Sequence, residues 1–123
     1  MFNFEKLEVW HKAVEFADQV YTVTQSFPEA ERFGLTNQMR RAAVSISSNI
    51  AEGSSRSCKS DFARFVHMAA GSVFEVVSHA TICQRQGLIS KEAFLRLYAA
   101  AEEQSKMLSG LKRSLNQPLS TID

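Results

Sequence analysis

Side chains that could perform chemistry are few in this sequence and widely spaced. Glu8 and His11 have the Glu-x-x-His spacing with which helical bundles hold a pair of metal ions. Such a site needs two of these segments and two further glutamates. Glu75 and His79 are four residues apart instead, which fits a buried hydrogen-bonded pair. We therefore expect no metal centre and no cofactor.

Motifs for covalent or phosphate chemistry are also missing from the sequence. It contains no G-x-S-x-G, H-E-x-x-H, G-x-x-x-x-G-K or G-x-G-x-x-G segment. Cys58 and Cys83 stand alone, and the N-terminal M-F-N-F-E-K is not a secretory signal. These features predict two reduced thiols in a cytoplasmic protein that has no catalytic residue and no identified small-molecule substrate.

A basic cluster is the main candidate for a binding site. Residues 40–64 contain five basic and two acidic side chains, an excess of +3 in a chain whose net charge is only +1. Basic side chains gathered on one surface can neutralise phosphates, although runs of charge also occur on surfaces that bind nothing. The candidate nucleic-acid-binding residues are Arg40, Arg56, Lys59 and Arg64.

A polar line runs through the same region beside an apolar stripe. The apolar residues at helical steps are Leu35, Met39, Ala42, Ala43, Ile46 and Ile50, and the polar ones are Gln38, Arg41, Ser45, Asn49 and Glu52. So regular a polar line indicates either a functional surface or a hydrogen-bonded seam between helices or subunits. Arg41 is expected to form an ion pair within or between subunits, with Glu52 or Glu75 as the partner.

The segments that hold these residues show a helical period throughout. Apolar side chains recur every three or four residues, and no stretch alternates with a period of two, which predicts an all-α protein. A chain of 123 residues is long enough for one domain with its own core. We predict a single up-and-down antiparallel four-helix bundle over residues 1–123, with helices at about 4–25, 36–52, 60–86 and 91–116.

Residues suited to helix ends occur at the predicted boundaries. A hydroxyl side chain can accept a hydrogen bond from the first backbone N–H groups of a helix, and a glycine after its end tolerates left-handed backbone. On this basis the expected N-caps are Thr36, Ser57 or Ser60, and Ser90, and the expected C-terminal glycines are Gly53 and Gly87.

The third predicted helix is apolar on almost every side. Fourteen of the 22 residues from 62 to 83 are hydrophobic, and Arg64 and Glu75 carry the only formal charges. A helix on the surface of a monomeric bundle needs a solvated face, so this helix is expected to contact a second subunit as well as the core. No uninterrupted apolar run reaches the ~18 residues of a membrane span, and no membrane contact is expected.

The order of these signals resembles the four helix bundle protein family, first noticed as open reading frames in intervening sequences of bacterial 23S rRNA genes. The resemblance covers nearly the whole chain. It is carried by Phe27-Pro28, Phe33-Gly34-Leu35, Gln38, Arg40-Arg41-Ala42-Ala43, Ser45-Ile46, Asn49-Ile50-Ala51-Glu52-Gly53, and Ala70-Gly71-Ser72 with Glu75.

The resemblance implies properties that the residues alone do not show. Members form bundles that assemble as rings, typically homopentamers, and most have no assigned biochemical role. Related accessory proteins of diversity-generating retroelements use a basic bundle pentamer to bind nucleic acid and a reverse transcriptase. The first hypothesis is thus a non-enzymatic oligomeric bundle that binds RNA, DNA or a nucleoprotein through the basic cluster. The alternative is a protein-interaction scaffold ring that binds no nucleic acid.

Overall fold

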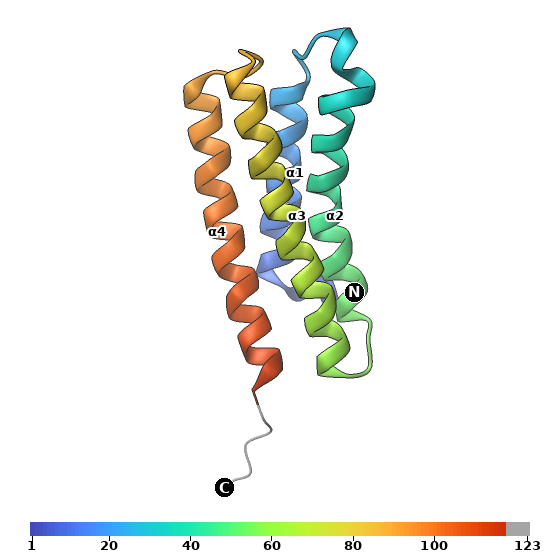
Figure 1. The fold of residues 1–123 in the computed structure, drawn as a ribbon. Helices are drawn as coiled ribbons and strands as arrows, with labels where there is room; N and C mark the ends of the chain where they lie inside the picture. Colours follow the sequence, from blue (N-terminus) through green and yellow to red (C-terminus); the bar gives the residue numbers. More distant parts are fainter. Residues whose placement is uncertain (118–123) are drawn as a thin grey trace, which may run out of the picture.

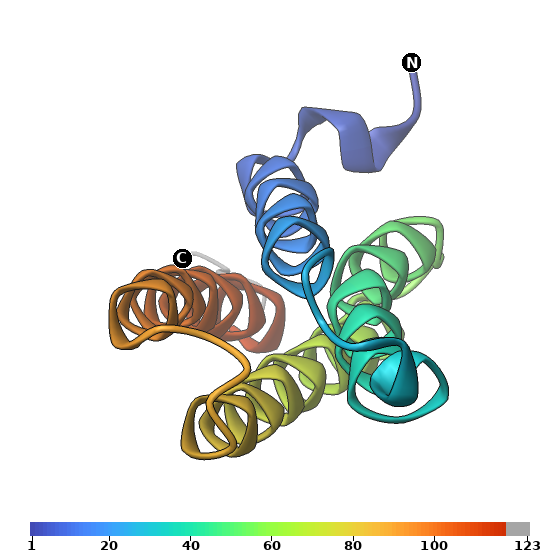
Figure 2. The ribbon, with the colours of Figure 1, turned by 90° about the horizontal axis from the view of Figure 1, so that it is seen from above.

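The computed structural model describes residues 1–117, in which four long helices are joined by short connections. They are α1 (Glu8–Thr24), α2 (Asn37–Ser54), α3 (Lys59–Arg85) and α4 (Lys91–Asn116), each antiparallel to the one before it (Figure 1). Along the bundle axis they occupy four corners in chain order, so that α4 returns to the side of α1 (Figure 2). The predicted all-α, up-and-down four-helix bundle is confirmed.

The core forms where the apolar stripes of the four helices meet. The stripe predicted on α2 is correct, because Met39, Ala42, Ala43, Ile46 and Ile50 are buried, while Leu35 is only partly buried. The other three helices contribute Phe16 and Val20, Val66 and Val73, and Leu97 and Leu108. Since full burial of one such large side chain stabilises the fold by about 1.5–3 kcal/mol, this core is the main source of stability.

The first helix begins at Glu8, four residues later than predicted. Asn3–Lys6 form a 3-10 turn, and Leu7 then takes extended backbone with φ −96° and ψ 120°. This break lets the Phe4 ring pack 4.8 Å from the Trp10 ring, measured between centroids. The Nε2 atom of His11 donates a hydrogen bond to the Glu5 carbonyl over 2.7 Å. Contacts across the break therefore replace the continuous helix that the sequence pattern suggested.

The connection between α1 and α2 contains two short helical turns. It holds a 3-10 turn at Glu29–Glu31 and a wider turn at Arg32–Thr36 that is kinked at Gly34. Thr36 consequently has helical backbone, and its hydroxyl is buried without a hydrogen-bond partner. The prediction that Thr36 caps α2 is wrong, because the chain is already turning helically before it reaches this residue.

Gly53 does not act as the C-terminal glycine that was predicted to end the second helix. It is buried inside α2, and a Cβ atom there would lie 2.7 Å from Phe65 Cβ and 2.8 Å from the Phe62 ring. The glycine therefore allows α3 to approach α2 closely. The next helix is preceded by Cys58, which has extended backbone and makes no side-chain capping bond, so the predicted caps Ser57 and Ser60 are also wrong.

The connection between α3 and α4 is as predicted. Gly87 has a φ of 75°, its N–H donates to the Gln84 carbonyl, and the N–H of Leu88 donates to the Cys83 carbonyl over 2.8 Å. This is the Schellman pattern that ends many helices. Ser90 then caps α4, because its hydroxyl accepts a hydrogen bond from the Ala93 N–H over 3.0 Å. Both predictions for this connection are confirmed.

The third helix exposes much of its apolar surface. By length and composition α3 could cross a membrane, as could many core helices of soluble proteins, yet only 33% of its most apolar 18-residue window is buried in the bundle. Phe62, Ala70 and Val77 are partly buried against the core, whereas Met68, Phe74 and Ile82 are exposed. A single protomer therefore leaves the predicted second contact of this helix open to solvent.

The close contact at Gly53 gives a stability prediction. Gly53→Ala should destabilise the protein by about 1–3 kcal/mol, because the new methyl group overlaps Phe62 and Phe65 and the two helices must separate. Urea denaturation followed by circular dichroism measures this change. Gly110→Ala is the matched control, since a Cβ there would meet only the end of the Arg113 side chain at 3.9 Å. An equal effect of both substitutions would contradict the close-packing explanation.

Candidate functional site

The predicted basic cluster is divided between two places in the bundle. Arg56, Lys59 and Arg64 lie together around the connection between α2 and α3. Arg40 is near the other end of α2, sixteen residues before Arg56, which corresponds to about 24 Å along a helix. The four candidate residues therefore do not form one continuous site within a protomer.

Two of the clustered arginines are already neutralised by carboxylates. Arg56 Nη2 lies 2.9 Å from Glu52 Oε2, and Arg56 Nε lies 3.6 Å from Asp61 Oδ2. Arg64 Nη2 lies 2.9 Å from Asp61 Oδ1. Both guanidinium groups also lie over the Phe65 ring, 4.6 and 4.7 Å from its centroid. Among the described residues Lys59 forms no ion pair, so it is the member of this group with an uncompensated charge.

Arg40 connects α2 to α1. Its Nε donates a hydrogen bond to the buried Thr24 hydroxyl over 2.9 Å, and its guanidinium lies 4.5 Å from the centroid of the Tyr21 ring. A guanidinium stacked on an aromatic ring adds a cation–π attraction to the hydrogen bond. Arg40 thus has a structural function that was not predicted from the sequence, because no local spacing links it to the end of α1.

The predicted polar line on α2 forms only a partial seam. The hydroxyl groups of Ser45 and Ser72 hydrogen-bond between α2 and α3, and Asn49 Nδ2 donates to the Ser45 carbonyl over 2.8 Å. Gln38, Arg41 and Glu52 are exposed.

Arg41 does not form the predicted ion pair inside the protomer. Glu52 is paired with Arg56, and Glu75 Oε2 lies 3.4 Å from His79 Nε2. The predicted hydrogen bond between Glu75 and His79 is therefore present, but Glu75 is exposed and not buried. An ion pair from Arg41 to a second subunit stays a prediction.

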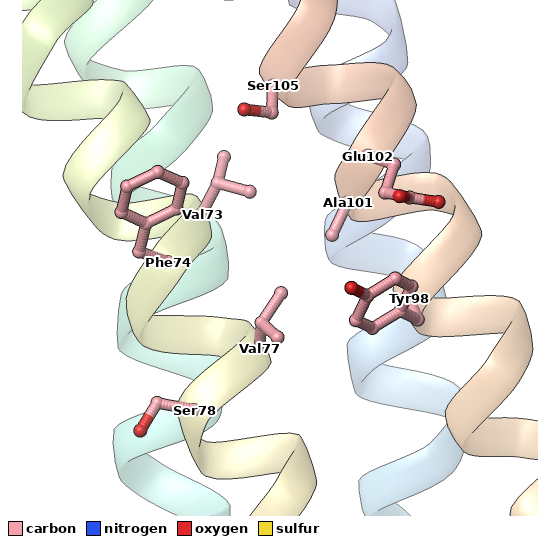
Figure 3. A pocket seen from close by; sticks show the side chains of 8 residues that line it. All are labelled: Val73, Phe74, Val77, Ser78, Tyr98, Ala101, Glu102 and Ser105. Atoms are coloured by element: carbon pink, nitrogen blue, oxygen red, sulfur yellow. The ribbon is translucent and has the colours of Figure 1, made fainter.

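A groove between α3 and α4 was not predicted as a site. It has a volume of about 340 Å³ and is lined by Val73, Phe74, Val77, Ser78, Tyr98, Ala101, Glu102 and Ser105. Side chains from the two helices face one another across it (Figure 3). Phe74 is 68% exposed beside this groove. The signal in the sequence was the excess of apolar residues in α3, but the pairing with Tyr98 depends on how α4 packs.

The chemistry of this groove suits an apolar side chain. Its floor is formed by valine and alanine, and its polar atoms belong to two serines, Tyr98 and Glu102 at the rim. Interfaces between proteins combine a desolvated apolar centre with a polar rim in the same way. The groove can thus accept an apolar side chain.

The two thiols lie in different surroundings. Cys58 is exposed at the start of α3, and the hydrogen bond with the Ser60 hydroxyl lowers the pKa of its thiol. Cys83 is buried beside Met39, and burial raises the pKa of its thiol to about 11. Within residues 1–117 no three histidine, cysteine, aspartate or glutamate side chains converge on a metal position.

Comparison with known proteins gives one family and one fold. The model of the family described as 23S rRNA-intervening sequence protein matches residues 5–110. The fold is similar to the crystal structure of a protein of unknown function from the S23 ribosomal protein family of Bacteroides thetaiotaomicron, with a TM-score of 0.76 and 23% identity. That similarity covers 85% of this chain and 98% of the other. No curated protein matches the sequence.

The neighbouring arginines of α2 provide a test of these assignments. Arg40→Ala should lower the free energy of unfolding by about 1–2 kcal/mol, because it removes a hydrogen bond and a cation–π contact between two helices. Arg41→Ala, the matched control, should change it by less than about 0.5 kcal/mol, since Arg41 is exposed and forms no ion pair within residues 1–117. Thermal or urea unfolding measures both variants. Equal free energies of unfolding for the two variants would show that Arg40 does not stabilise the packing of α1 against α2.

Proposed function

This chain belongs to the 23S rRNA-intervening sequence protein family, and on that premise we propose that it is a non-enzymatic, self-assembling helical bundle of the cytoplasm that binds other macromolecules. The observation that carries the proposal is the apolar surface of α3 and α4, with Phe74 exposed beside the groove that Val77 and Tyr98 line. Exposed apolar side chains gathered on one face mark contact sites for other proteins. A second copy of the chain is the partner proposed for this groove.

The proposed assembly is the homopentamer that the family resemblance implies. Five copies of the 13.8 kDa chain give about 69 kDa. A ring also multiplies every surface feature of the protomer, including those that are weak in one copy. In the first place we propose a protein-interaction scaffold ring, because the apolar groove supports contacts between proteins, whereas carboxylates within the protomer already compensate Arg56 and Arg64.

Nucleic-acid binding is the second candidate function, and it depends on assembly. Its support is the excess of +3 over residues 40–64, the uncompensated Lys59, and the repetition of this charge around a ring. Arg56 and Arg64 weaken the case, because each already contacts Asp61. The proposed contacts of Arg40, Arg56, Lys59 and Arg64 are to phosphates, and hence independent of base sequence.

Self-assembly through the groove can be tested by adding a charge. At micromolar protein concentration, Phe74→Glu should convert the ring to the 13.8 kDa protomer, because closing the groove interface would bury an unpaired carboxylate. Leu95→Glu is the control, since Leu95 is exposed on α4 but does not line the groove. Sedimentation velocity gives the masses, and circular dichroism checks that both variants are folded. A wild-type monomer at micromolar concentration, or two variants with the same mass as the wild type, would contradict the proposal.

The nucleic-acid hypothesis predicts a steep dependence on salt. The logarithm of the affinity for duplex DNA should fall with the logarithm of salt concentration by about 0.9 for each phosphate neutralised. Fluorescence anisotropy with labelled RNA and DNA measures this slope. Lys59→Glu should weaken binding more than Lys91→Glu, which makes the same charge change at the first residue of α4, at the opposite end of the bundle. Absence of binding at ~50 mM salt, where phosphate contacts are strongest, would leave the protein-interaction scaffold as the function.

A further inference from the structure

Gly71, in the middle of α3, has no evident purpose within the protomer. A Cβ atom added there would meet nothing within 4 Å, whereas the same test at Gly53 meets two phenylalanines. Among the described glycines only Gly87 has a positive φ, so left-handed backbone does not explain Gly71 either. Glycine is unfavourable in the interior of a helix, and the protomer gains nothing from it at this position.

The exposed side of α3 has a regular pattern around this glycine. Arg64, Met68, Gly71 and Glu75 follow one another at steps of four, three and four residues, which places them on one line of the helix. Met68 is 43% exposed, and the side chains of Arg64 and Glu75 are 59% and 55% exposed. Met68 and Gly71 therefore lie at the centre of the line. The positive charge of Arg64 is at one end and the negative charge of Glu75 is at the other.

We propose that this line packs antiparallel against the same line of a second copy of the chain, an inference that rests on the self-association proposed above. The twofold axis passes between residues 69 and 70. Residues 64 and 75 are equally far from this axis, and so are residues 68 and 71. Each Gly71 consequently lies beside the partner's Met68, and each Arg64 lies beside the partner's Glu75.

The shapes and charges of the line favour this arrangement. The missing side chain at Gly71 leaves space for a methionine from the partner and lets the two helix backbones approach closely. A parallel arrangement in register would place Arg64 next to the partner's Arg64, and like charges at an interface oppose association. The pattern is self-complementary only when the two helices are antiparallel, which is the requirement of a twofold contact.

Both charged residues retain a group for the new ion pair. Arg64 contacts Asp61 through Nε and Nη2, while its Nη1 lies 3.9 Å from the Met68 sulfur and so extends along the line. Glu75 contacts His79 through Oε2, and its Oε1 has no hydrogen-bond partner among the described residues. The intermolecular pair can thus form without breaking either contact inside the protomer.

This contact is distinct from the groove that Phe74 borders, and it changes the expected stoichiometry. A twofold contact alone gives a dimer, twice the 13.8 kDa of the chain. Together with a fivefold ring it would join two rings. Because only one helix of each copy takes part, the interface is small and its association should depend on concentration.

Gly71 provides the first test, because replacing it should stabilise the protomer and weaken the pairing of two copies. Gly71→Ala should raise the thermal midpoint of the dissociated protomer and, at the same time, raise the dissociation constant of the pairing at least tenfold. Gly110→Ala is the matched control, because Gly110 lies inside α4 and a Cβ atom there would meet only the end of the Arg113 side chain at 3.9 Å, but its neighbours one turn away, Lys106 and Arg113, are both charged and exposed. It should raise the midpoint without changing the dissociation constant. Sedimentation equilibrium of the full chain measures the association.

An exchange of charges tests the register. Arg64→Glu and Glu75→Arg should each weaken pairing, and the double variant should restore it to within about threefold of the wild type, because the same two positions meet with reversed signs. A dissociation constant unchanged within twofold by Gly71→Ala, or a double variant no better than the single ones, would overturn the α3 pairing. If Phe74→Glu still dissolved the assembly in that case, the proposed function would stand and only this contact would fall. A wild-type protein that is still monomeric at hundreds of micromolar would contradict both the proposed self-assembly and the α3 pairing.

Discussion

A helix at the corner of a four-helix bundle can bury only the side that faces its neighbours, and α3 has more apolar surface than that side can hold. Its inner residues, such as Val66, Val73 and Ala80, complete the core. Met68, Phe74 and Ile82 remain outside. This mismatch between apolar content and available burial is the constraint from which the proposed self-assembly follows, since apolar area left in water favours association.

The architecture was predictable wherever a local pattern determines structure. Helical periodicity gave four helices in antiparallel order, and the Gly87–Ser90 connection follows from the preferences of single residues. Gly53 shows where such reasoning ends. A glycine at the end of a predicted helix suggests a left-handed cap, but this one is explained by Phe62 and Phe65 of the next helix. Contacts between helices are not encoded at any fixed spacing, so the sequence alone could not reveal this function.

The candidate site was predictable to a smaller extent for the same reason. Composition located the positive charge around residues 40–64, but it could not show that Asp61 lies between Arg56 and Arg64 and contacts both. Nor could it show that Arg40 would be held by Thr24 and Tyr21 of another helix. The groove between α3 and α4 forms only when the two helices pack together, so no pattern within one helix predicts it. Charge counts along a chain therefore overestimate the charge that a folded surface offers to a ligand.

Assembly of the protein, as we propose it, covers the outer surface of α3. Hydroxyl-radical footprinting across a range of protein concentrations tests it most directly, because it reports the solvent access of single side chains. Oxidation of Met68 and Phe74 should fall as concentration rises, while Phe33, 85% exposed in the connection before α2, should react equally at every concentration. If Met68 and Phe74 stay as reactive as in the dilute protein at all concentrations, the protein does not assemble through the outer surface of α3.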